Sequence, residues 1–216
     1  MGTILASTIL ATAADVLQDA SEVRWTAAKK LGFLNDGIRE LITAKPEAYV
    51  VNGNLTLVAG TKQSLPAGTV LLMDVTRNMG ASGTAPGRVP RFIEKKELDA
   101  ENPNWHTDTV SATVKHWTYD KRDPLNYYVY PPQPATAQGK LEAVRSAIPS
   151  AIASNTAIPV GDEYANALAD YVLYRCYSKD PQSIDLSNKY YQSFLLVVTG
   201  KKKIEEEAEP SGDKEK

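Results

Sequence analysis

The sequence has few of the residues that build covalent or metal sites. Among 216 residues there is one cysteine, Cys176, and there are two histidines, His106 and His116. A single cysteine excludes an internal disulfide framework and a cysteine-based zinc site, and it is typical of proteins that fold in a reducing interior. His106 and Asp108 stand two apart in "NWHTD", but a metal would need further ligands at suitable spacing. We therefore expect neither a metal site nor a cofactor.

An excess of charge of one sign is also lacking. Lys and Arg number 24 against 26 Asp and Glu, which gives a formal net charge of −2. This balance predicts no general attraction to nucleic acid or to anionic lipid. The N-terminal stretch "MGTILASTILATAADVLQDA" is apolar but has no basic start, and Asp15 and Asp19 interrupt it early. It therefore fits neither a signal peptide nor a membrane span, and no membrane partner is expected.

Catalytic motifs are missing from the sequence as well. There is no G-x-S-x-G nucleophile motif. Cys176 falls on the apolar stripe of a predicted helix, so we expect it to be buried and inert. These observations predict that the protein is not an enzyme.

A glycine-rich loop, "RNMGASGTAPGRVP", follows a predicted strand. It lacks the Gly-Lys-Ser/Thr ending of a phosphate-binding loop, and Pro90 with a strand-like segment follows where a helix would be needed. We interpret it as a long, mobile loop that orders against a partner. The candidate contact residues in it are Arg77, Asn78, Gly80, Gly83, Gly87 and Arg88.

Helical patterns occupy both ends of the chain. In "SEVRWTAAKKLGFLNDGIRELITAKP" apolar residues recur three or four apart, which predicts a helix that starts at Ser21 as N-cap and ends before Pro46. A shorter helix is expected at residues 12–20. Two more apolar stripes, in 164–176 and 184–198, predict an antiparallel helix pair. Asp180 should cap the second of these helices, and Gly200 should end it.

Between the helical ends, short β-branched runs alternate with Asn-Gly, Ala-Gly and Pro-Ala-Gly turns. Strands are expected at residues 88–93, 112–119, 127–130 and 141–148, with a helical turn at 94–100. The predicted fold is α+β: a helical bundle with an inserted antiparallel β-sandwich or barrel. The predicted parts are N-terminal helices at 1–47, a β-domain at 48–158, the helix pair at 159–200 and a charged flexible tail at 201–216.

The segment "HWTYDKRDPLNYYVYPPQP" is rich in aromatic residues. Alternation places Trp117 and Tyr119 on one side of a strand, and Tyr128 and Tyr130 on one side of the next. Such a face could stack sugars or bases, or it could fill a β-core. No basic stripe accompanies the aromatics, so we favour the four residues as core and keep a glycan- or receptor-binding module as the alternative function.

Several segments, taken in their order, resemble a known family. They are "RWTAAKKLGFLNDGIREL", "KQSLPAGTVLLMDVTRN", "ELDAENPNW", "YDKRDPLNYYVYPP" and "DYVLYRCYSKD…NKYYQSF". The chain resembles podophage-type head-to-tail adaptor (connector) proteins of tailed bacteriophages and is loosely similar to tail tubular protein A.

The resemblance implies a structural protein of the virion neck. Such adaptors form a ring, usually of twelve copies, that joins the portal protein to the tail nozzle or tail tube protein. Double-stranded DNA passes through the lumen without sequence-specific binding, and assembly takes place in the host cytoplasm. The near-neutral charge of this chain agrees with a lumen that does not retain phosphate.

The last sixteen residues, "KKKIEEEAEPSGDKEK", contain almost no apolar side chains. Free in solution, we expect this segment to be disordered. It is either a solvated tail or an arm that docks on the portal or on an adjacent subunit. For the second case the candidate contacts are Lys201, Lys202, Lys203, Glu205 and Glu206.

Overall fold

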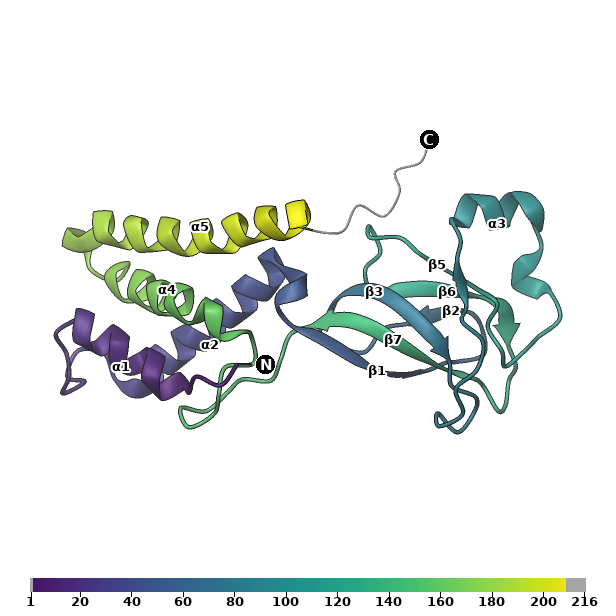
Figure 1. Ribbon diagram of the computed structural model, residues 1–216, viewed down its shortest axis with the longest axis horizontal. Helices are drawn as coiled ribbons and strands as arrows, with labels where there is room; N and C mark the ends of the chain where they lie inside the picture. Colours follow the sequence, from purple (N-terminus) through teal and green to yellow (C-terminus); the bar gives the residue numbers. More distant parts are fainter. Residues whose placement is uncertain (1, 209–216) are drawn as a thin grey trace. The chain divides into compact units, whose positions relative to one another are not determined.

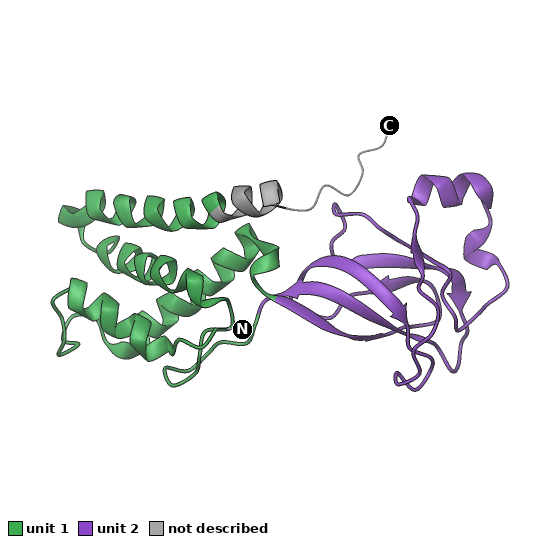
Figure 2. Cartoon of the chain, viewed as in Figure 1, with its two compact units in different colours: residues 1–49, 149–216 green, residues 50–148 purple. Residues whose placement is uncertain are grey.

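The structure, a computed structural model, describes residues 2–208, with side chains up to residue 200. The chain forms two compact units, one made of residues 1–49 and 149–216 and the other of residues 50–148 (Figure 2). The first, here called the helical unit, is built from both ends of the chain. The second, here called the β unit, holds two sheets. The predicted α+β class, a helical bundle with an inserted β-sandwich, is confirmed.

The helical unit is organised around α4 (Ala165–Tyr177). α1 (Ala6–Val16), α2 (Ala27–Ala44) and α5 (Ile184–Ala208) all pack against α4, as Figure 1 shows. Short 3-10 turns at Pro46–Ala48, Asp162–Tyr164 and Pro181–Ser183 flank these helices. The buried side chains that form this core include Leu34, Ile38, Leu41, Leu168, Val172 and Phe194. The predicted antiparallel helix pair is therefore α4 and α5.

The beginning of α2 differs from the prediction. Thr26, not Ser21, is the N-cap, and its side chain accepts a hydrogen bond from the Lys29 amide. The Asp19 carboxylate accepts hydrogen bonds from the amides of residues 23, 24 and 25, at 2.7–3.1 Å. This closes a turn over the residues that were expected to start the helix. The preceding helix also lies earlier than predicted, at Ala6–Val16.

The end of α5 is a second correction. The Asp180 side chain accepts from the Gln182 amide, as the sequence predicts, but the helix continues through Gly200 to Ala208. A single glycine costs a helix only about 1 kcal/mol, and "KKKIEEEA" after it consists mostly of strong helix formers. The expected C-terminal position of Gly200 is therefore wrong, whereas the remainder of the tail, 209–216, lies outside the described residues.

The β unit is a sandwich of two sheets. The first has the order β1-β7-β3 and the second has the order β2-β6-β5-β4. Residues from both sheets, among them Leu55, Val75, Trp117, Val129 and Leu141, form one core. The strand bounds are Val50–Thr56 (β1), Gly60–Ser64 (β2), Thr69–Asn78 (β3), Arg91–Phe92 (β4), His116–Tyr119 (β5), Asn126–Gln133 (β6) and Lys140–Ala147 (β7).

Two strands are shorter than predicted. β4 keeps only Arg91 and Phe92 of the expected run 88–93, and it pairs parallel to β5 where antiparallel pairing was expected. β5 begins at His116 rather than at residue 112. Between β4 and β5, α3 (Lys95–Glu101) and a 3-10 turn (Trp105–Thr107) form an excursion from the sandwich. No helix in residues 2–208 is long and apolar enough to cross a membrane.

Candidate interaction surfaces

The aromatic hairpin of β5 and β6 contributes to the core, but not with all four expected residues. Trp117 is only 5% exposed, and the Phe92 ring meets it edge-on at 4.9 Å. Tyr119 packs partly buried on the same face. On β6 the core residues are Tyr127 and Val129, whereas Tyr128 and Tyr130 lie on the opposite face of the sheet. The prediction that Tyr128 and Tyr130 belong to the β-core is therefore wrong.

A second packed layer covers that opposite face. Trp105, which is completely buried, stacks on His106 at 3.7 Å and meets Tyr128 edge-on at 6.1 Å. The Trp105 Nε1 atom donates to the Asp99 Oδ1 atom at 2.8 Å. Trp105 was not predicted as a core residue, although an indole that follows "ELDAENPN" indicates a packed excursion. The hairpin thus has aromatic packing on both faces.

His106 and Asp108, weighed as partial metal ligands, serve this layer in different ways. The Thr61 hydroxyl lies 2.8 Å from the His106 Nδ1 atom. The Tyr130 hydroxyl donates to the Asp108 Oδ2 atom at 2.7 Å, and this bond is the main reason that the pKa of Asp108 is lowered. Within residues 2–208 no group of three His, Cys, Asp or Glu side chains is arranged to hold a metal ion.

The glycine-rich loop is anchored at its base by Asn78. The Asn78 Nδ2 atom donates to the carbonyls of Arg88 at 2.7 Å and Val114 at 2.9 Å, and its Oδ1 atom accepts from the Val114 amide at 2.8 Å. The backbones of residues 78 and 88 bond each other as well, and the Gly87 amide donates to the Asn78 carbonyl. Asn78 is buried, so its side chain serves the fold.

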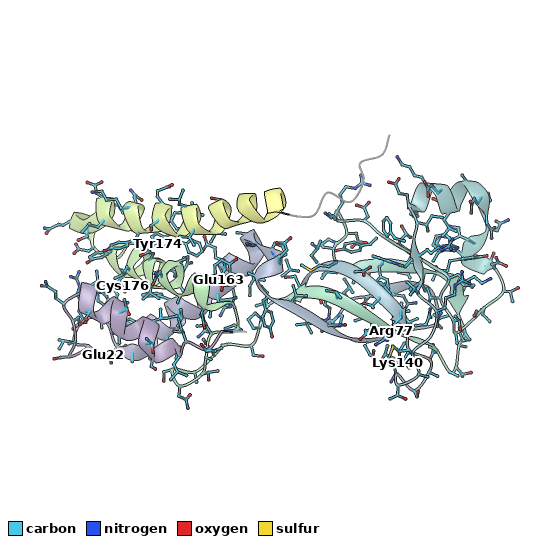
Figure 3. The ribbon with its side chains drawn as sticks, viewed as in Figure 1. Glu22, Arg77, Lys140, Glu163, Tyr174 and Cys176 are labelled. Carbon is cyan, nitrogen blue, oxygen red and sulfur yellow. The ribbon has the colours of Figure 1, made fainter. Side chains whose placement is uncertain are left out.

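Strand β7 and Asn54 hold the loop further along. Arg77 donates through Nε to the Glu142 Oε2 atom at 2.6 Å, and Lys140 donates through Nζ to the Ser82 carbonyl at 3.3 Å; Figure 3 labels both cations. Gly83 is buried with φ +82°, and its carbonyl accepts from Asn54 Nδ2 at 2.7 Å. Gly80 also has positive φ, and its carbonyl accepts from the Lys140 amide. Arg88 is the one loop candidate whose exposed side chain forms no hydrogen bond or ion pair with described residues.

Three cations gather near His116 at the outer strand of the four-stranded sheet. Arg91 is the pairing partner of His116, and Arg88 and Lys115 flank this pair along the chain. The imidazole stacks on the Tyr130 ring at 6.1 Å, and its Nδ1 atom is buried without a hydrogen bond among described residues. Burial lowers the pKa of His116, and the three cations lower it further, against Glu101, which raises it. We call Arg88, Arg91 and Lys115 the cationic edge.

An open hollow of about 420 Å³ lies beside this edge, between Phe92, the first turn of α3 and the β5–β6 turn. Its lining carries charges of both signs. Asp120 and Arg122 pair within it, and their hydrogen bond holds the pKa of Asp120 at about 2. Lys95 lies over the Tyr128 ring at 5.3 Å. The hollow is therefore a polar surface feature with mixed charge.

Two reactive groups in the helical unit, Cys176 and Lys30, are buried; Figure 3 labels Cys176 and also Glu22, the partner of Lys30. Cys176 is almost fully buried, and burial raises the pKa of its thiol to about 11, so the thiolate that a nucleophile needs is disfavoured. Lys30 is fully buried, and its Nζ atom lies 3.1 Å from the Glu22 Oε1 atom. The other Glu22 oxygen accepts from the Ala27 amide at the start of α2. This ion pair fixes the turn between α1 and α2.

The helical unit presents apolar surface on two sides of α4. On α5, Leu196 is 72% exposed, because Phe194 and Val198 face α4 instead. On α1, an open hollow of about 310 Å³ is lined mainly by Leu10 and alanines, with Asp15 and Glu22 at its rim. α1 and α5 both pack against α4 and make few contacts with each other, so these surfaces belong to different sides of the unit.

The remaining candidate contacts belong to the end of α5. Lys201, Lys202, Lys203, Glu205 and Glu206 lie in its last turns, so the three lysines do not follow a helix end as expected. Their side chains are outside the described part of the structure. Docking through these residues stays a prediction.

Comparison with protein-family models gives a match over most of the chain. A family described as SU10 adaptor protein matches residues 5–209, which span both units. No curated protein matches the chain.

Proposed function

The chain belongs to the SU10 adaptor protein family, a family of phage adaptors, and from this premise we propose that it is the head-to-tail adaptor of a tailed bacteriophage. In this proposal copies of the chain form a ring, with twelve copies expected from the resemblance. The ring joins the portal protein to the tail nozzle or tail tube and surrounds the DNA exit channel. The protein is then a structural part of the virion neck, assembled in the host cytoplasm.

The observation that carries the proposal is the extent of the family match. It covers the helical unit, the inserted β unit and the helix that returns to the bundle, so it concerns the whole architecture. The alternative, a glycan- or receptor-binding module, depends on an exposed aromatic face. It is not favoured, because Trp117 is buried and Tyr128 is half-buried against the edge of Trp105.

The two apolar surfaces of the helical unit support ring formation. A closed ring needs two different, complementary surfaces on each subunit, so that the contact repeats head to tail. Leu196 on α5 supplies a protruding apolar side chain, and the hollow beside Leu10 on α1 supplies a recess. In the proposed ring, α5 of one copy packs on α1 of the next.

The experiment combines electron microscopy with mass measurement. The purified protein is mixed with the portal protein of the same phage and imaged by negative stain, with light scattering to obtain the mass of the complex. We expect a ring added to one end of the portal. A mixture that stays as separate portal rings and free chains would refute the adaptor assignment.

A pair of variants tests the ring contact. Leu196→Glu should leave the fold intact and remove the added ring, because it places a charge in an apolar contact. Val58→Glu is the matched control, since Val58 is an exposed apolar residue of the β unit. If Leu196→Glu assembles as well as the control, α5 does not form the subunit interface.

A further inference from the structure

Strand β4 leaves a backbone edge open. The amides of Arg91 and Ile93 donate to the carbonyls of Lys115 and Trp117, at 2.9 and 3.0 Å. In a parallel pair with this pattern, the residue between them points its N–H and C=O away from the neighbouring strand. That residue is Phe92, whose amide donates no hydrogen bond to any described residue and whose side chain is 56% exposed.

The cationic edge surrounds this backbone. Arg88, Arg91 and Lys115 form no ion pair with described residues, whereas two other arginines of the β unit, Arg77 and Arg122, each have a carboxylate partner and Arg145 bonds the Thr69 hydroxyl. The acidic groups close to the edge are few. Asp108 accepts hydrogen bonds from Tyr130 and Asn102 and also attracts Lys115, and the charge of Glu101 on α3 acts on His116. Asp108 and Glu101 thus offset part of the positive charge, whereas Arg88 and Arg91 have no ion-pair partner among the described residues.

Charge on an edge strand is also a common protection against unwanted strand pairing. Protection alone requires one or two solvated charges, however, and it gives no reason for apolar side chains beside them. Phe92 and Val89 are both more than half exposed at this edge. Exposed apolar groups among cations, with a free donor and acceptor, match the requirements of strand addition: main-chain bonds, a pocket for alternate side chains and complementary charge.

We propose that β4 is a docking site for an extended, acidic peptide segment of a neighbouring protein, which adds to the four-stranded sheet as a further strand. The cations receive its carboxylates, and Phe92 supplies the main-chain bonds. A nucleic-acid backbone would use the cations but not the Phe92 donor and acceptor, so the peptide is the better fit. The identity of the neighbour as another neck protein rests on the proposed function. The peptide contact at the edge is argued independently of that function.

A fluorescence anisotropy titration tests the contact with a defined probe. The probe is a labelled peptide of alternating Glu and Val. We expect it to bind, and to bind more weakly as salt rises, because exposed charge pairs are screened over about 8–10 Å near physiological ionic strength. Arg91→Glu should weaken binding roughly tenfold, which corresponds to about 1.4 kcal/mol. Lys62→Glu, the same charge change on β2 at the opposite edge of the sheet, should leave it unchanged.

Two further probes separate strand addition from simple charge attraction. The same peptide with N-methylated backbone amides keeps its charge but loses donors, and it should bind much more weakly. The NMR titration of His116 is an independent reporter: a bound anion should raise its pKa, since the repulsion from the neighbouring cations is then offset. Lys115→Glu replaces Arg91→Glu should the latter fail to fold.

Three outcomes would overturn the inference. They are no binding of the acidic peptide, equal binding by Arg91→Glu and Lys62→Glu, and tighter binding of duplex DNA than of the peptide. Undiminished binding of the N-methylated peptide would overturn the strand addition. The portal mixture is a separate experiment. Wild-type protein that joins the portal but does not bind the peptide would refute only the edge contact. Wild-type protein that binds the peptide but does not join the portal would refute only the adaptor role.

Discussion

Asn78→Ala is expected to destabilise the β unit, because Asn78 holds the base of the loop that carries Arg88. The substitution removes three hydrogen bonds, two to Val114 and one to the Arg88 carbonyl. Val114 is fully buried, so its amide and carbonyl both lose a partner where water does not replace it. The Arg88 carbonyl can be hydrated, because that residue is exposed.

The magnitude follows from the two buried groups. Each buried polar group left unsatisfied costs about 1–3 kcal/mol, so the loss of both partners of Val114 should cost about 2–6 kcal/mol. Asn78→Asp should be at least as destabilising, since it turns a carboxylate oxygen toward two carbonyl oxygens. Asn54→Ala is the control: it removes a single bond, to the Gly83 carbonyl, and should cost about 1 kcal/mol.

Urea unfolding followed by the fluorescence of Trp105 and Trp117 measures the change in the β unit. Because a chain with two units need not unfold in one step, hydrogen exchange at the Val114 amide is the decisive measurement. The free energy of opening measured at this amide should fall by the same amount. An exchange rate equal to that of wild type, with an unchanged urea midpoint, would show that Asn78 does not anchor the loop.

The remaining predictions concern other parts of the two units. Trp117→Ala should destabilise the β unit by about 3–5 kcal/mol, the range for a buried large aromatic, and an unchanged urea midpoint would contradict its place in the core. Phe194→Ala, which removes a ring that meets Tyr171 at 5.1 Å, should cost the helical unit about 3–5 kcal/mol; circular dichroism on heating measures it, and a neutral result would separate α5 from the bundle. His116→Gln should reduce the loss of stability between about pH 7 and pH 5, because the lowered pKa of His116 lets the unfolded chain bind the proton first as pH falls through about 6.5. Identical pH profiles of the melting temperature for both proteins would contradict that assignment. The glycine-rich loop was expected to be mobile, whereas its anchors at Asn78 and Gly83 should give measurable exchange protection at the Gly87 amide, which donates to Asn78.

The sequence predicts the helices well where one apolar stripe decides the outcome. Leu34, Ile38 and Leu41 are three or four apart and are all buried. The start of α2 was mispredicted because the Asp19 carboxylate gathers three amides of the following turn, and apolar spacing carries no information about that competition. Helix ends depend on such side-chain bonds more than helix interiors do.

The face of a strand on which each side chain lies was harder to predict than the position of the strand in the sequence. Tyr127, Tyr128 and Tyr130 place tyrosine on both faces of β6, so alternation alone leaves two registers possible. The choice depends on which face meets the other sheet and which meets Trp105, and both partners are distant in sequence. The cationic edge was missed for a similar reason: parallel pairing of β4 with β5 brings Arg91 to Lys115 and His116 across an excursion.

The pairing of β1 with β7 has a consequence for how such a protein can evolve. Val50 stands opposite Ser146, so the chain enters and leaves the β unit on adjacent antiparallel strands. A domain whose two ends are neighbours can be exchanged, enlarged or removed while the host fold keeps its connection. A short loop from Tyr49 to Pro149 would close the helical unit without the β unit. Related chains can therefore carry different β units while the helical unit keeps the same connection.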